Sequence, residues 1–313
     1  MTALALPKRM RAPGLIVAMA VMVVGFAVAS RDFAMPGNVL NIIMQSSVLL
    51  LVALPMTFVI LTEGLDLSVG AVVSLCSVAL AQIALATGSL VMTSAAGVLV
   101  GALAGAVNGG LIAYLRIPPF VATLGTLGAA QSLALVLTGG QSVTGLPANV
   151  LFIYGGSILG VPAPILIIVA AYAIMHSLLY LTPFGSFVFA LGGNREALTL
   201  AGVSWRRMLM AVYVLGGAWA GVAALVLASR LSAGHPTAAI GMEFDSIAAV
   251  ALGGTSFEHG DGWLLGTLLG VAAIGILRNG LNLMAVSSSV QVCCIGVLVI
   301  LAFTLEAFQA PES

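Results

Sequence analysis

The sequence predicts an all-α protein that crosses a membrane about ten times, and three observations support this fold class. Hydrophobic residues make up 61% of the chain and charged residues only 6%, against roughly 25% charged in an ordinary soluble domain. The mean hydropathy is +1.20. The 37 glycines indicate helices in close backbone contact, because lipid supplies no hydrophobic drive between them. At about 20 residues per crossing, no large soluble domain fits, so residues 1–313 are predicted to form a single transmembrane domain.

Ten apolar windows follow one another along the chain, and nine of them are long enough for a membrane helix. They lie at residues 14–30, 39–61, 67–86, 90–115, 120–137, 163–181, 209–231, 244–255, 263–285 and 289–308. The first window follows three basic residues and imitates a signal peptide, but its length favours a retained first span. The window at 244–255 is too short to cross as a regular helix. We therefore expect a broken or half-helix near residues 240–256 that lines a cavity.

The basic residues orient the chain through the positive-inside rule. Placing the amino terminus inside leaves Arg31 outside and Arg230 near the outer edge. The basic residues then predicted on the cytoplasmic side are Lys8, Arg9, Arg11, Arg116, Arg195, Arg206 and Arg207. The carboxyl terminus is also cytoplasmic, provided that the short window is one true passage. This orientation gives a cytoplasmic loop at 184–208 and an outer loop at 139–164, whose Gly, Pro and Ser content suits a shallow docking surface.

Polar side chains within or between the apolar windows need either an interhelical hydrogen bond or a wet interior, and the sequence leaves both interpretations open. Uncharged amides and hydroxyls suit a sugar. Asp66 can also cap the helix that follows it, and Arg278 can pair with a carboxylate or a carbonyl. The candidates for a translocation path or gate are Glu63, Asp66, Asn108, Thr123, Asn279 and Asn282.

Glycines repeat at a spacing of four residues in three of the windows, which predicts helix faces without side chains that other helices approach closely. These glycines are Gly97, Gly101, Gly105 and Gly109, then Gly217 and Gly221, and then Gly266 and Gly270.

The motifs that enzymes need are absent from the sequence. The three histidines and three cysteines have no metal-ligand spacing, and no serine occupies a nucleophile elbow. There is no G-x-x-x-x-G-K-[ST] loop, so a nucleotide site for ATP-driven transport would belong to another polypeptide. A net charge of zero gives no reason to expect nucleic acid as a partner. We predict a chain that is not an enzyme and that binds no cofactor or metal.

The stretch GGNREALTLAG at residues 192–202 is predicted to form a short cytoplasmic helix. Asn194 can cap this helix, Glu196 favours its amino end, and Gly202 can stop it. An apolar surface suited to a groove on a cytoplasmic partner comes from Ala197, Leu198, Leu200 and Ala201.

Three segments together resemble the ribose-type permeases of bacterial ABC importers, the sugar branch that includes xylose, rhamnose, galactose and autoinducer permeases. They are EGLDLSVG at 63–70, where the family usually has GGIDLSVG, the loop at 193–202, and residues 236–262 followed by GTLLG at 266–270 and NGLN at 279–282. The chain departs from the family at Glu63, at Leu198, where a small residue is usual, and in the charged turn at 258–262.

The resemblance implies a permease of the bacterial inner membrane that imports a monosaccharide. It implies a dimer with a second copy or a paralogue, a cytoplasmic ATPase subunit, a periplasmic binding protein docking outside, and surrounding membrane lipid. By position, the residues of the ATPase-coupling loop are Asn194, Glu196, Ala197 and Gly202. One alternative is a permease of the branched-chain amino-acid branch, which would have a different sequence at 63–70. The other is an ion-coupled secondary transporter, which would need a mid-membrane carboxylate or histidine relay.

Overall fold

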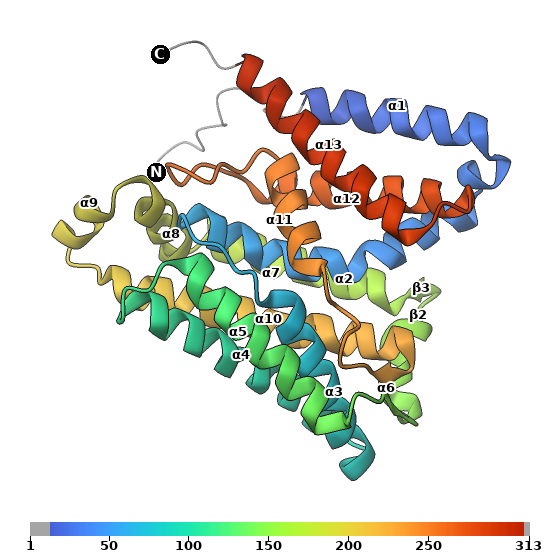
Figure 1. The fold of residues 1–313 in the computed structure, drawn as a ribbon, viewed down its shortest axis with the longest axis horizontal. Helices are drawn as coiled ribbons and strands as arrows, with labels where there is room; N and C mark the ends of the chain where they lie inside the picture. Colours follow the sequence, from blue (N-terminus) through green and yellow to red (C-terminus); the bar gives the residue numbers. More distant parts are fainter. Residues whose placement is uncertain (1–12, 310–313) are drawn as a thin grey trace.

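The computed structural model describes residues 13–309, which form a bundle of helices with two short antiparallel strand pairs (Figure 1). The helices are α1 Pro13–Ala29, α2 Pro36–Leu61, α3 Val69–Thr87, α4 Leu90–Ala113, α5 Pro119–Thr138, α6 Ala148–Gly155, α7 Ala163–Tyr180, α8 Pro183–Gly193, α9 Arg195–Leu200, α10 Trp205–Leu231, α11 Met242–Leu252, α12 Leu264–Leu283 and α13 Ser288–Gln309, with a 3-10 turn η1 at Arg31–Ala34. The strands are β1 Val143–Thr144, β2 Ser157–Ile158, β3 Val161–Pro162 and β4 Ala233–Gly234. Seven described helices, α2, α3, α4, α5, α7, α10 and α12, are long and apolar enough to cross a membrane. The all-α polytopic prediction is confirmed.

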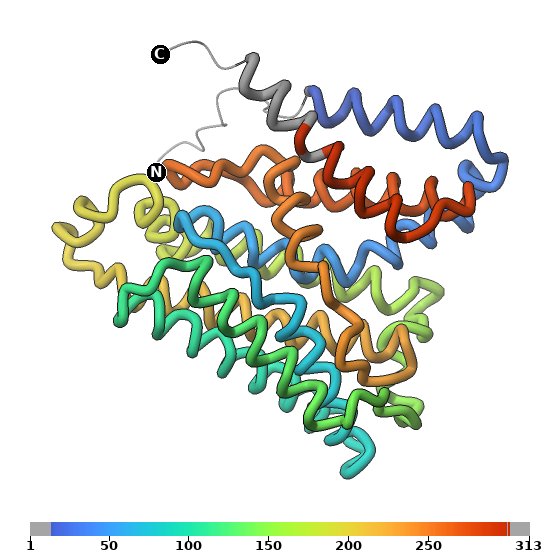
Figure 2. The backbone as a smooth tube through the Cα atoms, in the orientation of Figure 1, coloured from blue at the N-terminus to red at the C-terminus, as the bar shows by residue number. Residues whose placement is uncertain are grey.

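Each of the ten predicted windows contains a helix, and the short window near residues 240–256 is α11. With 11 residues, α11 is about 17 Å long, roughly half of the hydrocarbon core of a bilayer. Figure 2 shows a non-helical segment leading from β4 into the middle of the bundle, where α11 begins. The segment and α11 together run toward the end where α12 starts.

The core of the bundle is α2, in which every residue from Ser47 to Leu61 is buried. Helix α10 packs beside α2, and α4 packs on α10 through the predicted glycine faces. A Cβ added to Gly101 would overlap the carbonyl oxygen of Gly217, and one added to Gly221 would overlap that of Gly97. The second glycine face belongs to α12, where a Cβ on Gly270 would overlap a backbone carbonyl of α11. The predicted packing role of these glycines is confirmed.

The connections gather at two opposite ends of the bundle in Figure 1. One end, called the α9 end below, holds α9, the start of α10, the α2–α3 and α4–α5 connections and the turn at 253–263. The other, called the hairpin end, holds α6, η1 and the β2–β3 hairpin; there β1 pairs with β4, with Val143 opposite Gly234. The predicted outer loop at 139–164 is therefore structured and tied to the segment after α10.

Apart from Arg278 in α12, the described basic residues divide between the two ends as the sequence predicts. Elements of the α9 end carry Arg116, Arg195, Arg206 and Arg207, whereas Arg31 lies in η1 and Arg230 in the last turn of α10. The other predicted cytoplasmic residues, Lys8, Arg9 and Arg11, lie outside the described residues.

Candidate functional site

Helix α9 is a short helix with a side-chain cap at its start and a glycine just after its end. The Oδ1 of Asn194 accepts a hydrogen bond from the Ala197 N–H at 2.8 Å, which satisfies one of the free donors of the first turn. Gly202 has a φ of +80°, and the Val203 N–H donates to the Leu198 carbonyl at 3.2 Å, a closure typical of helix carboxyl ends. The predicted helix, its cap and its stop are confirmed.

The two leucines of α9 lie on opposite sides of the helix. Leu198 is 3% exposed and Leu200 is 84% exposed, as expected for residues about 200° apart around a helix. The expectation that Leu198 belongs to the outer apolar surface is wrong, because it packs inward against its own chain. The exposed residues of the loop are Gly193, Asn194, Arg195, Glu196, Ala197, Thr199, Leu200, Ala201 and Gly202.

Helix α8 connects α9 to the core through a close backbone contact. A Cβ on Gly192, near the end of α8, would overlap the carbonyl oxygen of Leu61 at the end of α2. Gly260, with a φ of +61°, approaches α8 from the 253–263 turn, and its Cβ would lie 2.7 Å from the Phe189 carbonyl oxygen. The His259 N–H also donates to Glu63 Oε1 at 3.4 Å. A displacement of α8 therefore acts directly on α2 and on this turn.

A cavity of about 410 Å³ lies next to α9 and includes the side chains of Glu63, Arg116, Arg195 and Trp205 in its lining. The Arg195 guanidinium carbon stands 4.6 Å from the centre of the Trp205 ring, within cation–π distance. This contact ties the first residue of α9 to the first residue of α10.

Three of the predicted path residues meet in one buried network rather than along an open channel. Asp66 accepts hydrogen bonds from the Ser68 N–H at 2.8 Å and the Ser68 hydroxyl at 2.6 Å, and Asn108 donates to Ser68 Oγ at 2.9 Å. Thr123 donates to the Leu65 carbonyl at 3.3 Å. Burial raises the pKa of the Asp66 carboxyl, and its bonds to Ser68 oppose that rise. Asp66 therefore bonds within the α2–α3 connection, whereas Asn108 of α4 and Thr123 of α5 bond to that connection from neighbouring helices.

The other three predicted path residues lie apart from that network. Glu63 is exposed at the α9 end, with a φ of +58°. Asn279 exchanges two hydrogen bonds with Asn38, at 2.8 and 2.9 Å, which join α12 to α2. Asn282 is exposed and accepts from Gln291 of α13 at 2.8 Å. Asn38 was not identified from the sequence, and no local pattern distinguishes it from other polar residues near a helix start.

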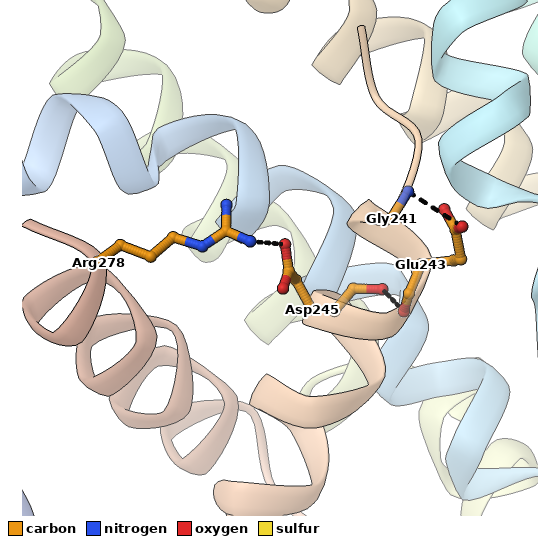
Figure 3. Close-up of polar contacts among 5 residues, drawn as sticks. Gly241, Glu243, Asp245 and Arg278 are labelled. Atoms are coloured by element: carbon orange, nitrogen blue, oxygen red, sulfur yellow. Dashed lines mark hydrogen bonds and ion pairs between the residues drawn. The ribbon is translucent and has the colours of Figure 1, made fainter. Parts of the chain in front are cut away.

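The first turn of α11 carries two carboxylates that point to opposite sides, as Figure 3 shows. Asp245 forms an ion pair with Arg278 of α12, with 2.5 Å between Oδ2 and Nη2. Glu243 turns the other way, where its Oε1 accepts from the Gly241 N–H at 3.1 Å. Its Oε2 is buried without a hydrogen-bond partner, close to Gly70 of α3. Sequence reasoning allowed a carboxylate partner for Arg278 but missed Glu243, although an acidic pair opening a short apolar helix is a usable signal.

The titratable side chains of the described chain are dispersed. Within residues 13–309, no three His, Cys, Asp or Glu side chains come together as metal ligands. Cys76, Cys293 and Cys294 are free thiols.

Comparison with known proteins places the chain among transport permeases. A family model described as "Branched-chain amino acid transport system / permease component" matches residues 38–303. The ribose import permease protein RbsC of Bacillus subtilis is 40% identical over 91% of this chain and 89% of its own length. RbsC of Escherichia coli K12 is 37% identical over 93% and 92%, and the D-allose transport system permease protein AlsC of the same strain is 33% identical over 92% and 89%. No solved structure matches the chain.

Proposed function

We propose, from the premise that the chain belongs to the family of branched-chain amino-acid transport system permease components, that it is the membrane subunit of an ABC importer for a monosaccharide. The observation that carries this proposal is identity of 33–40%, over at least 91% of the chain, to permeases named for ribose and allose. The family description names branched-chain amino acids, but these relatives favour the sugar branch. ATP hydrolysis would belong to a separate cytoplasmic ATPase subunit.

In this proposal α9 is the helix that contacts the ATPase, through Asn194, Glu196, Ala197 and Gly202. Their exposure at one end of the bundle supports the assignment, as does the capped, compact form of the helix. Because Leu198 is buried, α9 and α8 would move as one body. The closing and opening of the ATPase would then favour one access state and the other in turn, which requires differential contacts in the two states rather than chemistry in this chain.

The proposed setting is the bacterial inner membrane, with the α9 end in the cytoplasm. The four arginines on elements of that end support this orientation. If β4, the following segment and α11 together make one crossing, the number of crossings would be even and both termini would lie inside. The hairpin end, including residues 139–164, would receive the substrate from a periplasmic binding protein. A second permease copy or a paralogue would complete the membrane dimer within the lipid.

The test is to reconstitute the chain in lipid vesicles with its ATPase and binding protein and to measure ATP hydrolysis with a panel of pentoses and hexoses. Leucine and valine with a matching binding protein serve as the comparison. We expect one or more sugars, and neither amino acid, to raise the hydrolysis rate. Stimulation by the amino acids alone would favour the branched-chain alternative. Uptake at full rate in vesicles without any ATPase would contradict the proposal.

A further inference from the structure

A groove of about 550 Å³ lies between α11, α12 and α13. Its walls are mostly apolar, with Ile247 and Ala248 from α11 and Val292 and Gly296 from α13. Asp245 and Arg278 are the charged side chains among the described residues that line it. An apolar cavity of this size with a few convergent polar groups is typical of a small-molecule site.

Both members of the Asp245–Arg278 pair line the groove, but Arg278 is the more exposed member and Asp245 is mostly buried. The side chain of Arg278 is 40% exposed and that of Asp245 is 12% exposed. Arg278 lies about 8 Å before the end of α12 at Leu283, so it sits within the membrane layer. Charged side chains at such depth face a water-filled cavity or another protein surface, because hydrocarbon does not solvate them. The exposure of the Arg278 guanidinium, together with the groove beside it, therefore favours a groove that water enters.

The pair offers both kinds of hydrogen-bonding group that a polyol needs. The Asp245 carboxylate has acceptor capacity beyond its bond to Arg278, and the guanidinium is a planar fork with five N–H donors, of which one nitrogen bonds Asp245. Neighbouring hydroxyls of a sugar each donate and accept, so a diol can bridge the carboxylate and the guanidinium. By contrast, Asp66, Asn108 and Thr123 are buried in bonds within the chain.

We propose that the Asp245–Arg278 pair binds the hydroxyl groups of the sugar as it passes through the groove between α11, α12 and α13. This inference rests on the proposed import function and assigns part of its path. The pair provides the polar contact, and the apolar walls leave the sugar weakly held, as a transport path requires.

The first test compares sugar uptake by the complete transporter in vesicles, using each sugar that stimulates ATP hydrolysis in the unmodified complex. Asp245→Asn and Arg278→Gln should each lower uptake about tenfold or more, as for a site that hydrogen-bonds a substrate hydroxyl. Arg278→Lys keeps the charge but loses the fork, and its uptake should fall between those of Arg278→Gln and the unmodified chain. All variants must reach the membrane in equal amounts. Uptake within twofold of the unmodified transporter in both neutral variants would overturn the inference.

The second test separates a sugar contact from a purely structural ion pair. In a chain with Cys76, Cys293 and Cys294 replaced by alanine, Gly296→Cys places a thiol in the groove, and Gly128→Cys places one on α5. A Cβ at either glycine meets no atom within 4 Å, so both variants should fold. A charged, membrane-impermeant thiosulfonate should label the Gly296→Cys variant at least about tenfold faster than its control, because charged groups avoid hydrocarbon.

A transported sugar should slow this labelling severalfold, and adding Asp245→Asn should abolish the protection. An unreactive Gly296→Cys variant, or one that instead forms a disulfide between two copies, would identify a lipid or protein contact and overturn the inference. Protection that persists with Asp245→Asn would also overturn it. Failure of every sugar to drive the unmodified complex is a different result, since it refutes the import function while the labelling still reports whether water reaches the pair.

Discussion

The two leucines of α9 allow the anchoring of this helix to be tested separately from its outer surface. Leu198→Ala removes a side chain that is 3% exposed, and burial of this kind is worth about 2–5 kcal/mol. Because α9 has only six residues and lies at the edge of the bundle, we expect the lower part of that range, about 2–3 kcal/mol. At 1.4 kcal/mol per factor of ten, α9 would undock about 30 to 150 times more often.

Hydrogen exchange in α9 measures this opening directly. In Leu198→Ala, exchange of the Val203 amide, which donates to the Leu198 carbonyl, should accelerate by that factor. Leu200→Ala should leave the exchange rate unchanged, since Leu200 is 84% exposed, but should weaken ATPase binding by about five- to tenfold as an interface contact is lost. Unchanged exchange in Leu198→Ala would refute the inward anchoring of α9. Unchanged ATPase affinity in Leu200→Ala would remove this residue from the proposed interface.

Four further perturbations follow from the packing and the hydrogen bonds. Gly101→Ala should lower the free energy of unfolding by about 1–3 kcal/mol, because its Cβ overlaps the α10 backbone. The control Gly128→Ala should be neutral or stabilising by up to about 1 kcal/mol. Equal thermal stability of the two variants in detergent would contradict the close contact. Asn38→Ala leaves the Asn279 amide buried and unpaired, which should lower the free energy of unfolding by about 1–3 kcal/mol in the same assay. A decrease below about 0.5 kcal/mol would show that water replaces the lost hydrogen bond. Burial raises the pKa of the Asp66 carboxyl. The protonated carboxyl therefore stabilises the folded state at low pH, and this contribution to the free energy of unfolding is lost as pH rises through the folded-state pKa. Unfolding temperatures should depend less on pH in Asp66→Asn, and identical profiles would refute this. Gly202→Trp, at a φ of +80°, should uncouple ATP hydrolysis while membrane insertion stays intact, and undiminished sugar uptake would exclude this loop from coupling.

The elements that depend on composition and periodicity could be predicted from the sequence alone. The length of the apolar window at 244–255 predicted a helix too short to cross the membrane, which is α11. The four-residue spacing of the glycines predicted the faces through which α4 packs on α10. Both features are local, because a membrane helix satisfies its own backbone and shows its length directly in the apolar run.

The direction and partners of individual side chains could not be predicted in the same way. Helix α9 has apolar residues on both sides, so nothing local states that Leu198 faces inward and Leu200 outward. From the sequence alone, Asn108 is equally compatible with a path residue and a packing residue. Only the tertiary structure shows its hydrogen bond to Ser68. Glu243 was missed because an acidic residue at the edge of an apolar run resembles a loop, and its burial depends on a glycine of α3 far away in the sequence.

The proposed coupling and the proposed sugar contact are joined by the turn at 253–263. Gly260 of this turn lies against α8, and the turn links α11 to α12, the two helices that carry Asp245 and Arg278. Near its start, α12 touches the backbone of α11 at Gly270 and that of Gly253, just after α11, at Gly266, whereas Arg278 lies toward its other end. A push on α8 that tilts α12 about the glycine contact would therefore change the separation of the charged pair most. We expect the ATPase cycle to open and close this pair, and an Asp245–Arg278 separation that stays constant between nucleotide-free and ATP-bound complexes would contradict that coupling.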